Sequence, residues 1–249
     1  MGGIAGALVF ERSSFELDEP YLEQMARPII HRGAASWLRV ADDKKFGLVQ
    51  LGRAGGGAEA APPAASRKGG RLWVACDGEI YNRAFIAEEI EKSGGRSFSG
   101  GCSAAEVILS AYEQWGARCL EKFRGAYAFA LWDGAERELL LVRDPLGLKP
   151  LYYSIHHGRI TFASEIKALL QDPGQLREVD ELALFHYLSF LISPAPQTMF
   201  KGIKKLPSAR ELKVSAEGSM VERPYWDAWD QRISLGALSE EEIAAMVLD

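Results

Sequence analysis

The side chains best able to act as nucleophiles in this sequence are the thiols of Cys76, Cys102 and Cys119. Neither a CxxC spacing nor a histidine-rich stretch accompanies them, so the pattern indicates no zinc site and no disulfide framework. Cys76 ends the apolar run WVAC, which favours a small buried residue over a reactive thiol. Because sparse cysteines without a pairing pattern are typical of a reducing compartment, we expect a cytoplasmic protein.

Two pairs of neighbouring charged residues carry groups that could exchange protons. Arg143 stands beside Asp144, and Glu165 lies two residues before Lys167. Ion pairs of this kind commonly hold turns in place and contribute little by themselves. We therefore interpret both pairs as structural groups that fix turns and a neighbouring domain near the rim of the fold.

Composition narrows the class of protein that holds these groups. Of 249 residues, 47% are hydrophobic and 25% are charged, which is typical of a globular domain. The net charge is −5 and the basic residues are scattered, so nothing favours a nucleic-acid-binding surface. No apolar run reaches the about 18–20 residues that span a bilayer, and the N-terminus lacks the basic region of a signal peptide. We expect neither nucleic-acid nor membrane contact.

The spacing of apolar residues predicts the elements that position the chemical groups. The uniformly apolar start, 3–10, indicates a buried strand, and Asp18 is expected to cap a helix that begins at Glu19. We expect HRGAASW to form a turn, and the strand of RLWVACDGEIYN to turn at Asp77-Gly78. Further strands are predicted at 46–51, 125–133, 138–144, 150–158, 159–165 and around Glu217-Gly218, and helices at 82–94, 103–116, 164–171, 179–191 and 239–249.

Helices that flank two runs of antiparallel strands predict a layered α+β domain with stacked sheets. One stretch does not fit into such layers. Residues 52–70, GRAGGGAEAAPPAASRKGG, are rich in Gly, Ala and Pro and predict a mobile surface loop.

Several motifs together carry a family resemblance. They are GGIAG, HRG at 31–33, DGEIYN at 77–82, RDPLGLKPLYY at 143–153, FASEIKALL, MFKGIKKLPSARELKV and RPYWD. In the order and spacing of these motifs, the chain resembles the glutamine-hydrolysing half of an asparagine synthetase, a class II glutamine amidotransferase, from residue 2 to about residue 227. The resemblance implies an N-terminal-nucleophile (Ntn) hydrolase fold, a four-layer αββα sandwich with two antiparallel sheets between helices.

The resemblance also implies where the chemistry of the family would lie. In the family, a cysteine directly after the initiator methionine attacks the side-chain amide of glutamine; this position is Gly2, which has no side chain. The family's oxyanion-stabilising Asn is Asp77, followed by Gly78. An ionised Asp accepts hydrogen bonds but donates none, so it would repel a developing oxyanion.

The substrate-binding positions that the resemblance implies are altered as well. The family's Arg for the α-carboxylate falls on Gln50, which lacks both the charge and the fork geometry of an Arg; Arg53 is the alternative. The Asp for the α-amino group falls on Ala104, whereas Glu79 stands at a substrate-binding position of the family's N-G-E turn. The family's R-G-P-D turn reads RGAA at 32–35. We therefore interpret the glutaminase site as vestigial.

No nucleotide site is expected in this chain. SGGCSA at 99–104 is similar to the SGG-x-D-S pyrophosphate loop of the synthetase half, but it lacks the Asp and no phosphate-binding strand-loop-helix surrounds it. We expect no cofactor and no metal here, with ATP and Mg²⁺ bound only by a missing synthetase domain. Residues 228–249 are expected to form a linker and the start of a helix belonging to that domain.

Three functions remain open from the sequence. The first is a degenerate amidotransferase domain, similar to that of β-lactam synthetases, which acts as a scaffold or partner for an ATP-dependent amide-forming synthetase domain in cis or in trans. The second is a working glutamine-hydrolysing component of asparagine biosynthesis, with Cys76 as a displaced nucleophile. The third is a small-molecule-binding module that uses the emptied pocket. A homodimer is a further expectation, since members of the family often pair.

Overall fold

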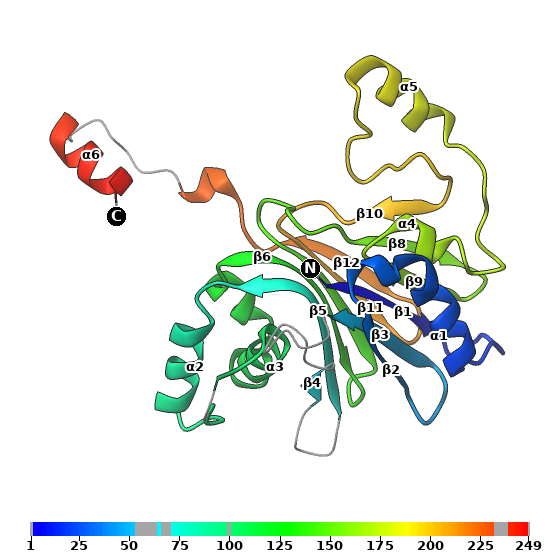
Figure 1. The fold of residues 1–249 in the computed structure, drawn as a ribbon, viewed down its shortest axis with the longest axis horizontal. Coiled ribbons are helices and arrows are strands. Elements are labelled where there is room, and N and C mark those ends of the chain that lie inside the picture. Colours follow the sequence, from blue (N-terminus) through cyan, green and yellow to red (C-terminus); the bar gives the residue numbers. More distant parts are fainter. Residues whose placement is uncertain (1, 53–63, 66–70, 99–100, 232–238, 249) are drawn as a thin grey trace.

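The computed structural model describes residues 2–52, 64–65, 71–98, 101–231 and 239–248. Within these residues, two antiparallel sheets lie face to face at the centre of the fold (Figure 1). The first sheet has the strand order β10-β8-β9-β1-β3-β2, and the second has the order β12-β11-β7-β6-β5-β4. The strands are β1 (Gly3–Val9), β2 (Ala35–Val40), β3 (Phe46–Gly52), β4 (Ala64–Ala65), β5 (Leu72–Ile80), β6 (Gly125–Asp133), β7 (Glu138–Arg143), β8 (Tyr152–His156), β9 (Arg159–Ala163), β10 (Ile203–Lys205), β11 (Arg210–Ser215) and β12 (Met220–Pro224).

Helices cover the outer face of each sheet. The helix α1 (Glu19–Ala26), the 3₁₀-helix η1 (Arg27–Arg32) and α4 (Ile166–Leu169) pack on the first sheet. On the second sheet lie α2 (Arg83–Lys92), α3 (Ala104–Trp115) and the 3₁₀-helix η3 (Gly116–Lys122). The predicted four-layer αββα sandwich is therefore confirmed.

Three apolar layers hold the sandwich together. Between the sheets, Ile4 and Leu8 of β1 meet the inner face of the second sheet, and the rings of Phe46 and Trp132 stack with centroids 4.6 Å apart. The other two layers lie between each sheet and its helices. Because β1 is covered on both faces, all seven of its residues are buried. This explains why its sequence is uniformly apolar instead of alternating.

Local sequence signals place the helix starts where they were predicted. The Asp18 carboxylate accepts a hydrogen bond from the Tyr21 backbone N–H at 2.8 Å, which caps α1. At the start of α3, Ser103 and Glu106 bind each other's backbone N–H groups in a capping box. Each cap satisfies donors that the first helical turn leaves free.

Two predicted turns are wrong. HRGAASW does not form one turn, because its first residues complete η1 and its last belong to β2, where Trp37 lies opposite Gln50 of β3. Asp77-Gly78 does not end a strand but lies inside β5, opposite Ala128 and Tyr127 of β6. In both cases a neighbouring strand supplies hydrogen-bond partners, and this pairing outweighs the local turn preference.

Three further segments complete the chain. Helix α5 (Glu181–Phe190) stands away from the sheets, and the 3₁₀-helix η4 (Ala228–Gln231) and helix α6 (Glu240–Leu248) follow β12 (Figure 1). Ser239 and Glu242 form the capping box predicted for α6. Most of the predicted loop 52–70 lies outside the described residues. None of the described helices combines the length and apolar character needed to cross a membrane.

Candidate functional site

Gly2 lies immediately before β1, and its missing side chain would point at β5. A Cβ atom built on Gly2 would lie 3.8 Å from Asp77 Oδ1, 3.9 Å from the Cys76 carbonyl oxygen and 3.0 Å from the Leu51 carbonyl oxygen. Two positions that are 75 residues apart in sequence are thus brought side by side, because β1 and β5 face each other across the two sheets. A side chain at position 2 would thus lie between the Leu51 carbonyl oxygen of β3 and the Asp77 carboxylate of β5.

Asp77 is fully buried and is held by two donors. Its Oδ2 atom accepts hydrogen bonds from Arg32 Nη2 at 2.7 Å and from the Ser164 hydroxyl at 3.1 Å. The Ser164 hydroxyl in turn accepts a hydrogen bond from the Ile4 backbone N–H at 3.0 Å. These bonds tie β5 to η1 and to the end of β9, so the carboxylate links both sheets.

Arg32 is the centre of this network. Its Nε donates to the Gly2 carbonyl oxygen at 2.8 Å, and its Nη1 donates to Glu165 Oε1 at 3.0 Å. Burial by itself would lower the pKa of Arg32, but the adjacent carboxylates of Asp77 and Glu165 outweigh it and raise the pKa. The guanidinium is therefore permanently charged and fully engaged by the protein's own groups.

The second oxygen of Asp77 has no hydrogen-bond partner within the described residues. Oδ1 is buried and lies on the side where a side chain at position 2 would be, with Lys149 Nζ 3.9 Å away. A buried carboxylate oxygen costs free energy unless it is paired. Lys149 forms an ion pair with this oxygen but is too far away for a hydrogen bond.

The positions with a predicted substrate-binding role meet at a small cavity next to this network. Gln50, Gly78, Glu79 and Ala104 line it together with Cys76. Its volume is about 20 Å³, which is room for about one water molecule. Small-molecule sites usually have about 300–1,000 Å³. Arg53, the proposed alternative carboxylate-binding residue, lies outside the described residues.

The polar groups around the small cavity bind one another. The side-chain oxygen of Gln50 accepts a hydrogen bond from the Cys76 backbone N–H at 3.0 Å. Glu79 of β5 forms an ion pair with Arg83, the first residue of α2. Both side chains at which the resemblance implies substrate contact are thus in use within the protein, and Ala104 contributes only a methyl group.

Cys76 is poorly placed to act as a nucleophile. Its side chain is buried, and burial followed by the charge of Asp77 raises the pKa of the thiol far above its usual value. Cys102 and Cys119 are also buried with raised pKa values, because burial disfavours the thiolate. The three free thiols therefore stay protonated at neutral pH.

The ion pair predicted near the rim is confirmed for Glu165 and Lys167, but the prediction is wrong for Arg143 and Asp144. Glu165 and Lys167 form an ion pair at 3.1 Å. Arg143 and Asp144 instead each bind backbone groups of the turn that follows β7. Arg143 donates to the Gly147 and Lys149 carbonyl oxygens at 2.7 Å, and Asp144 accepts from backbone N–H groups of the same turn. This turn fixes Lys149 opposite Asp77.

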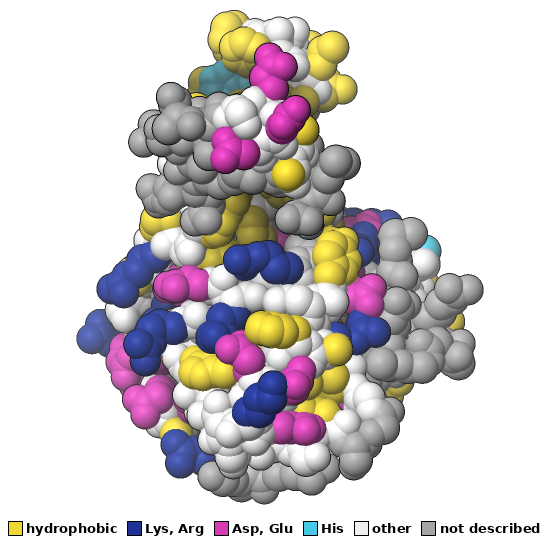
Figure 2. Space-filling view, turned by 90° about the vertical axis from the view of Figure 1, so that its left-hand side faces the viewer, with side chains coloured by type: hydrophobic (Ala, Val, Ile, Leu, Met, Phe, Trp, Pro, Cys, Tyr) yellow, Lys and Arg dark blue, Asp and Glu magenta, His cyan; other side chains and the backbone are white. Residues whose placement is uncertain are grey.

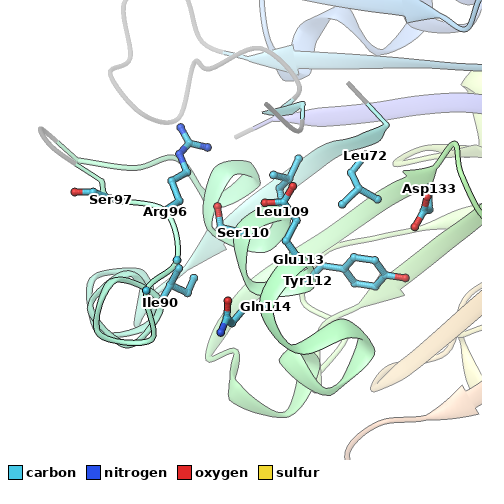
Figure 3. A pocket seen from close by; sticks show the side chains of 12 residues that line it. Leu72, Ile90, Arg96, Ser97, Leu109, Ser110, Tyr112, Glu113, Gln114 and Asp133 are labelled. Atoms are coloured by element: carbon cyan, nitrogen blue, oxygen red, sulfur yellow. The ribbon is translucent and has the colours of Figure 1, made fainter. Parts of the chain in front are cut away.

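A larger cavity lies elsewhere, between the end of α2, α3 and the start of β5 (Figure 3). Its volume is about 930 Å³, and none of the predicted site residues lines it. The Ser110 hydroxyl on its wall is buried and has no hydrogen-bond partner among the described residues. No motif in the sequence pointed to this cavity, whose wall includes Leu72, Ile90, Arg96, Leu109, Ser110 and Asp133.

Three residues that organise the site were not among those predicted from the sequence: Arg32, Lys149 and Ser164. Each lies in a motif that carried the family resemblance, namely HRG, RDPLGLKPLYY or FASE. Their positions within these motifs could have indicated that they belong to the site. In the described part of the chain, no cluster of three or more His, Cys, Asp or Glu side chains could hold a metal ion.

The family match is consistent with this geometry. The family described as the glutamine amidotransferase domain matches residues 1–226, and the chain belongs to this family. Its fold is also that of glutamine phosphoribosylpyrophosphate (PRPP) amidotransferase from B. subtilis, complexed with ADP and GMP, with a TM-score of 0.65 at 17% sequence identity over 90% of this chain and 49% of that one. The predicted Ntn-hydrolase sandwich is thereby confirmed.

Curated relatives extend well beyond the length of this chain. Asparagine synthetase [glutamine-hydrolyzing] 1 of Bacillus subtilis (strain 168) is 32% identical over 216 residues, which is 84% of this chain and 33% of that protein. Asparagine synthetase [glutamine-hydrolyzing] 3 of the same organism is 34% identical over 172 residues, which is 69% of this chain and 28% of that protein. The chain therefore spans about a third of these relatives.

Proposed function

We propose that this chain is an amidotransferase domain that no longer hydrolyses glutamine and acts as a scaffold for an ATP-dependent, amide-forming synthetase domain. The observation that carries the proposal is the arrangement of Gly2, Asp77 and Arg32. At the position facing Gly2 stands a buried carboxylate, which is already bound to Arg32 and has Lys149 3.9 Å away. The names of the longer relatives support a synthetase partner.

The chemical argument compares what hydrolysis requires with what the site supplies. Hydrolysis of an amide by this fold requires a nucleophile and donors for the oxyanion of the tetrahedral intermediate. Position 2 supplies no nucleophile, and Asp77 supplies only acceptor atoms. Removing one oxyanion donor typically costs about 10²–10³ in rate, and removing a nucleophile costs on the order of 10⁶. We infer a domain without glutaminase activity.

This proposal has consequences for domain organisation. Residues 2–227 form the amidotransferase domain, and 228–249 form a linker and a helix that belong with the synthetase domain. In this proposal, ATP and Mg²⁺ are bound by that domain and not by this chain. The synthetase domain is the proposed partner, and a homodimer of the chain is an independent expectation.

An ammonia-release assay tests the proposal. The purified chain is incubated with glutamine and compared with the Bacillus subtilis relative whose name describes it as glutamine-hydrolysing. We expect ammonia at the background rate from this chain and clear release from the relative. Release by this chain at a rate comparable to that of the relative would overturn the proposal.

Labelling by a glutamine-analogue chloroketone separates the second function from the first. A working glutaminase that uses Cys76 would become labelled at this thiol, and peptide mapping would find the label. Because Cys76 is buried and its pKa is raised, we expect no label on it in the folded chain. Labelling of denatured protein with iodoacetamide is the control that the peptide can be detected.

The small cavity counts against the third function, a ligand in the emptied pocket. A volume of about 20 Å³ accommodates no amino acid. A thermal-shift screen with amino acids and nucleotides at high excess checks this, since a ligand that binds the folded state raises the unfolding temperature. We expect no ligand to raise the unfolding temperature by binding at the cavity lined by Gln50 and Ala104.

A further inference from the structure

Helix α5 has an exposed apolar surface. It stands at the upper edge of the molecule in Figure 1, and Figure 2 shows hydrophobic side chains gathered at the same height. Of its ten residues, only Ala183 is buried. Leu188 is 71% exposed and Leu191, directly after the helix, is 75% exposed. We call this the α5 surface; it consists of Leu182, Phe185, Leu188, Phe190, Leu191 and Ile192.

The apolar side chains lie on every side of the helix. Successive residues of an α-helix are about 100° apart around its axis, so Leu182, Phe185 and Leu188 fall within about 120° of one another on one flank. Phe190 and Tyr187, which is 44% exposed, continue the apolar surface around the other flank. A helix that is hydrophobic all round is normally buried, and a contiguous exposed apolar patch marks an interaction site. The apolar residues of α5 are therefore typical of a helix that is buried on all sides in a complete assembly.

The protein presents this helix on a defined support. The Asp180 carboxylate caps it by accepting from the Ala183 backbone N–H at 2.9 Å. The segments before and after the helix bind each other, through Asp180 N–H to the Met199 carbonyl oxygen at 3.0 Å and Lys201 N–H to the Glu178 carbonyl oxygen at 2.9 Å. These two backbone hydrogen bonds join the segments on either side of α5 and so support the helix beyond β10.

The shape and chemistry of α5 favour one kind of occupant. Two copies that met through α5 would each bury one side of the helix and leave the other sides exposed. Enclosing all sides requires a concave apolar groove on a larger body. Glu181 is the one carboxylate on α5, so the groove needs little charge. The matching Bacillus subtilis relative continues for about two thirds of its length beyond the matched third.

We propose that α5 inserts into an apolar groove of the synthetase domain and is the principal docking element between the two domains. This inference rests on the proposed function, because that proposal supplies the synthetase domain as the partner. The occupant would cover α5 and the neighbouring edge formed by α4 and β10 (Figure 1).

Photo-crosslinking in the organism that makes the protein tests the occupant. Leu188 is replaced by p-benzoylphenylalanine, and the cross-linked peptides are identified by mass spectrometry. The matched control carries the same probe at Val221, which is 42% exposed on the edge strand β12. We expect the probe at Leu188, and not the probe at Val221, to cross-link to a synthetase sequence with an SGG-x-D-S loop, on whichever chain carries it.

The other outcomes overturn the inference. Cross-linking of Leu188 to α5 of a second copy would identify a dimer contact, and cross-linking to another class of protein would identify a different partner. No cross-link at Leu188 would also overturn it. The proposed function is judged separately, by whether an affinity-tagged chain recovers a synthetase domain at all. If the synthetase is recovered without a cross-link at Leu188, the proposed function stands and this inference fails.

A second set of variants measures the contribution of α5. Phe185→Asp with Leu188→Asp places charges on the α5 surface, whereas Met220→Asp with Val221→Asp places the same charges on β12. Since all four side chains are exposed, circular dichroism and the unfolding temperature should stay unchanged. We expect recovery of the synthetase domain to fall at least tenfold for the α5 pair alone. Equal recovery with both pairs would contradict the inference.

Discussion

Arg32 and Asp77 form an ion pair in which Nη2 and Oδ2 are 2.7 Å apart, with the carboxylate fully buried. The same guanidinium binds the Gly2 carbonyl oxygen and Glu165. At the place where the family resemblance implied an amide that stabilises an oxyanion, this chain thus has a charge pair that links η1 and β5. The pair has a clear structural role, and its removal has measurable consequences.

Removing Arg32 should destabilise the fold more than removing the charge of Asp77. Arg32→Met leaves a buried carboxylate without its main partner, and breaking a buried pair in this way costs about 3–5 kcal/mol. Asp77→Asn should cost less, because Arg32 retains Glu165 at 3.0 Å. Urea denaturation at pH 7 measures both free energies of unfolding. A small and equal effect of the two substitutions would show that the pair does not stabilise the fold.

The carboxylate of Asp77 should raise the pKa of a thiol introduced at position 2. In Gly2→Cys, the Cβ would lie 3.8 Å from Asp77 Oδ1, and a carboxylate at this range raises the pKa of a thiol. In Gly2→Cys with Asp77→Asn, we expect the midpoint of the pH profile of iodoacetamide alkylation to fall by about 1 unit or more. Gly2→Cys with Glu178→Gln, at a distant exposed carboxylate, is the control. Identical midpoints in all three variants would contradict the predicted coupling.

Asp172 should contribute stability that is lost in acid. Burial by itself would raise the pKa of Asp172, but hydrogen bonds from Arg159 and Tyr21 outweigh it and hold the pKa below its ordinary value of 3.8. A lowered pKa in the folded state means that the contribution is complete above the ordinary value and disappears as the pH falls through the lower one. The difference in unfolding free energy between the wild type and Asp172→Asn should therefore shrink as the pH falls from about 4 to 2.5; this window lies below the range in which His156, 3.7 Å from Asp172, also changes its charge. A difference that stays constant down to pH 2.5 would be the contrary result.

Gly78 should tolerate no side chain. Its φ is +124°, and a Cβ built on it would lie 2.0 Å from the Ala126 carbonyl oxygen of the paired strand. Gly94 also has a positive φ, +76°, but a Cβ there meets nothing within 4 Å. We expect Gly94→Ala to cost about 1–2 kcal/mol, and Gly78→Ala to cost considerably more or to prevent cooperative folding. Thermal denaturation followed by circular dichroism compares them; equal losses would contradict the steric argument.

The layers of the fold could be predicted from sequence because they depend on local patterns. Apolar spacing indicated the strands β1, β3 and β6 and the helices α2 and α3, and cap residues such as Asp18 and Ser103 marked helix starts. The two wrong turns, at HRGAASW and at Asp77-Gly78, have a common cause. Local preference favours a turn in both, but strands β3 and β6, which are distant in sequence, offer backbone pairing that outweighs it.

The sequence by itself determined which side chains are present, with no thiol at position 2 and a carboxylate at position 77. It also indicated the family of related domains. Only the tertiary structure decided how these residues are used. It placed Arg32, Ser164 and Lys149 around Asp77, closed the predicted substrate pocket to about 20 Å³ and left α5 exposed. The reason is physical. The free energy of a buried charge, and the volume of a cavity, depend on the residues that the packing of the two sheets brings next to them. The spacing of residues along the chain does not contain these distances.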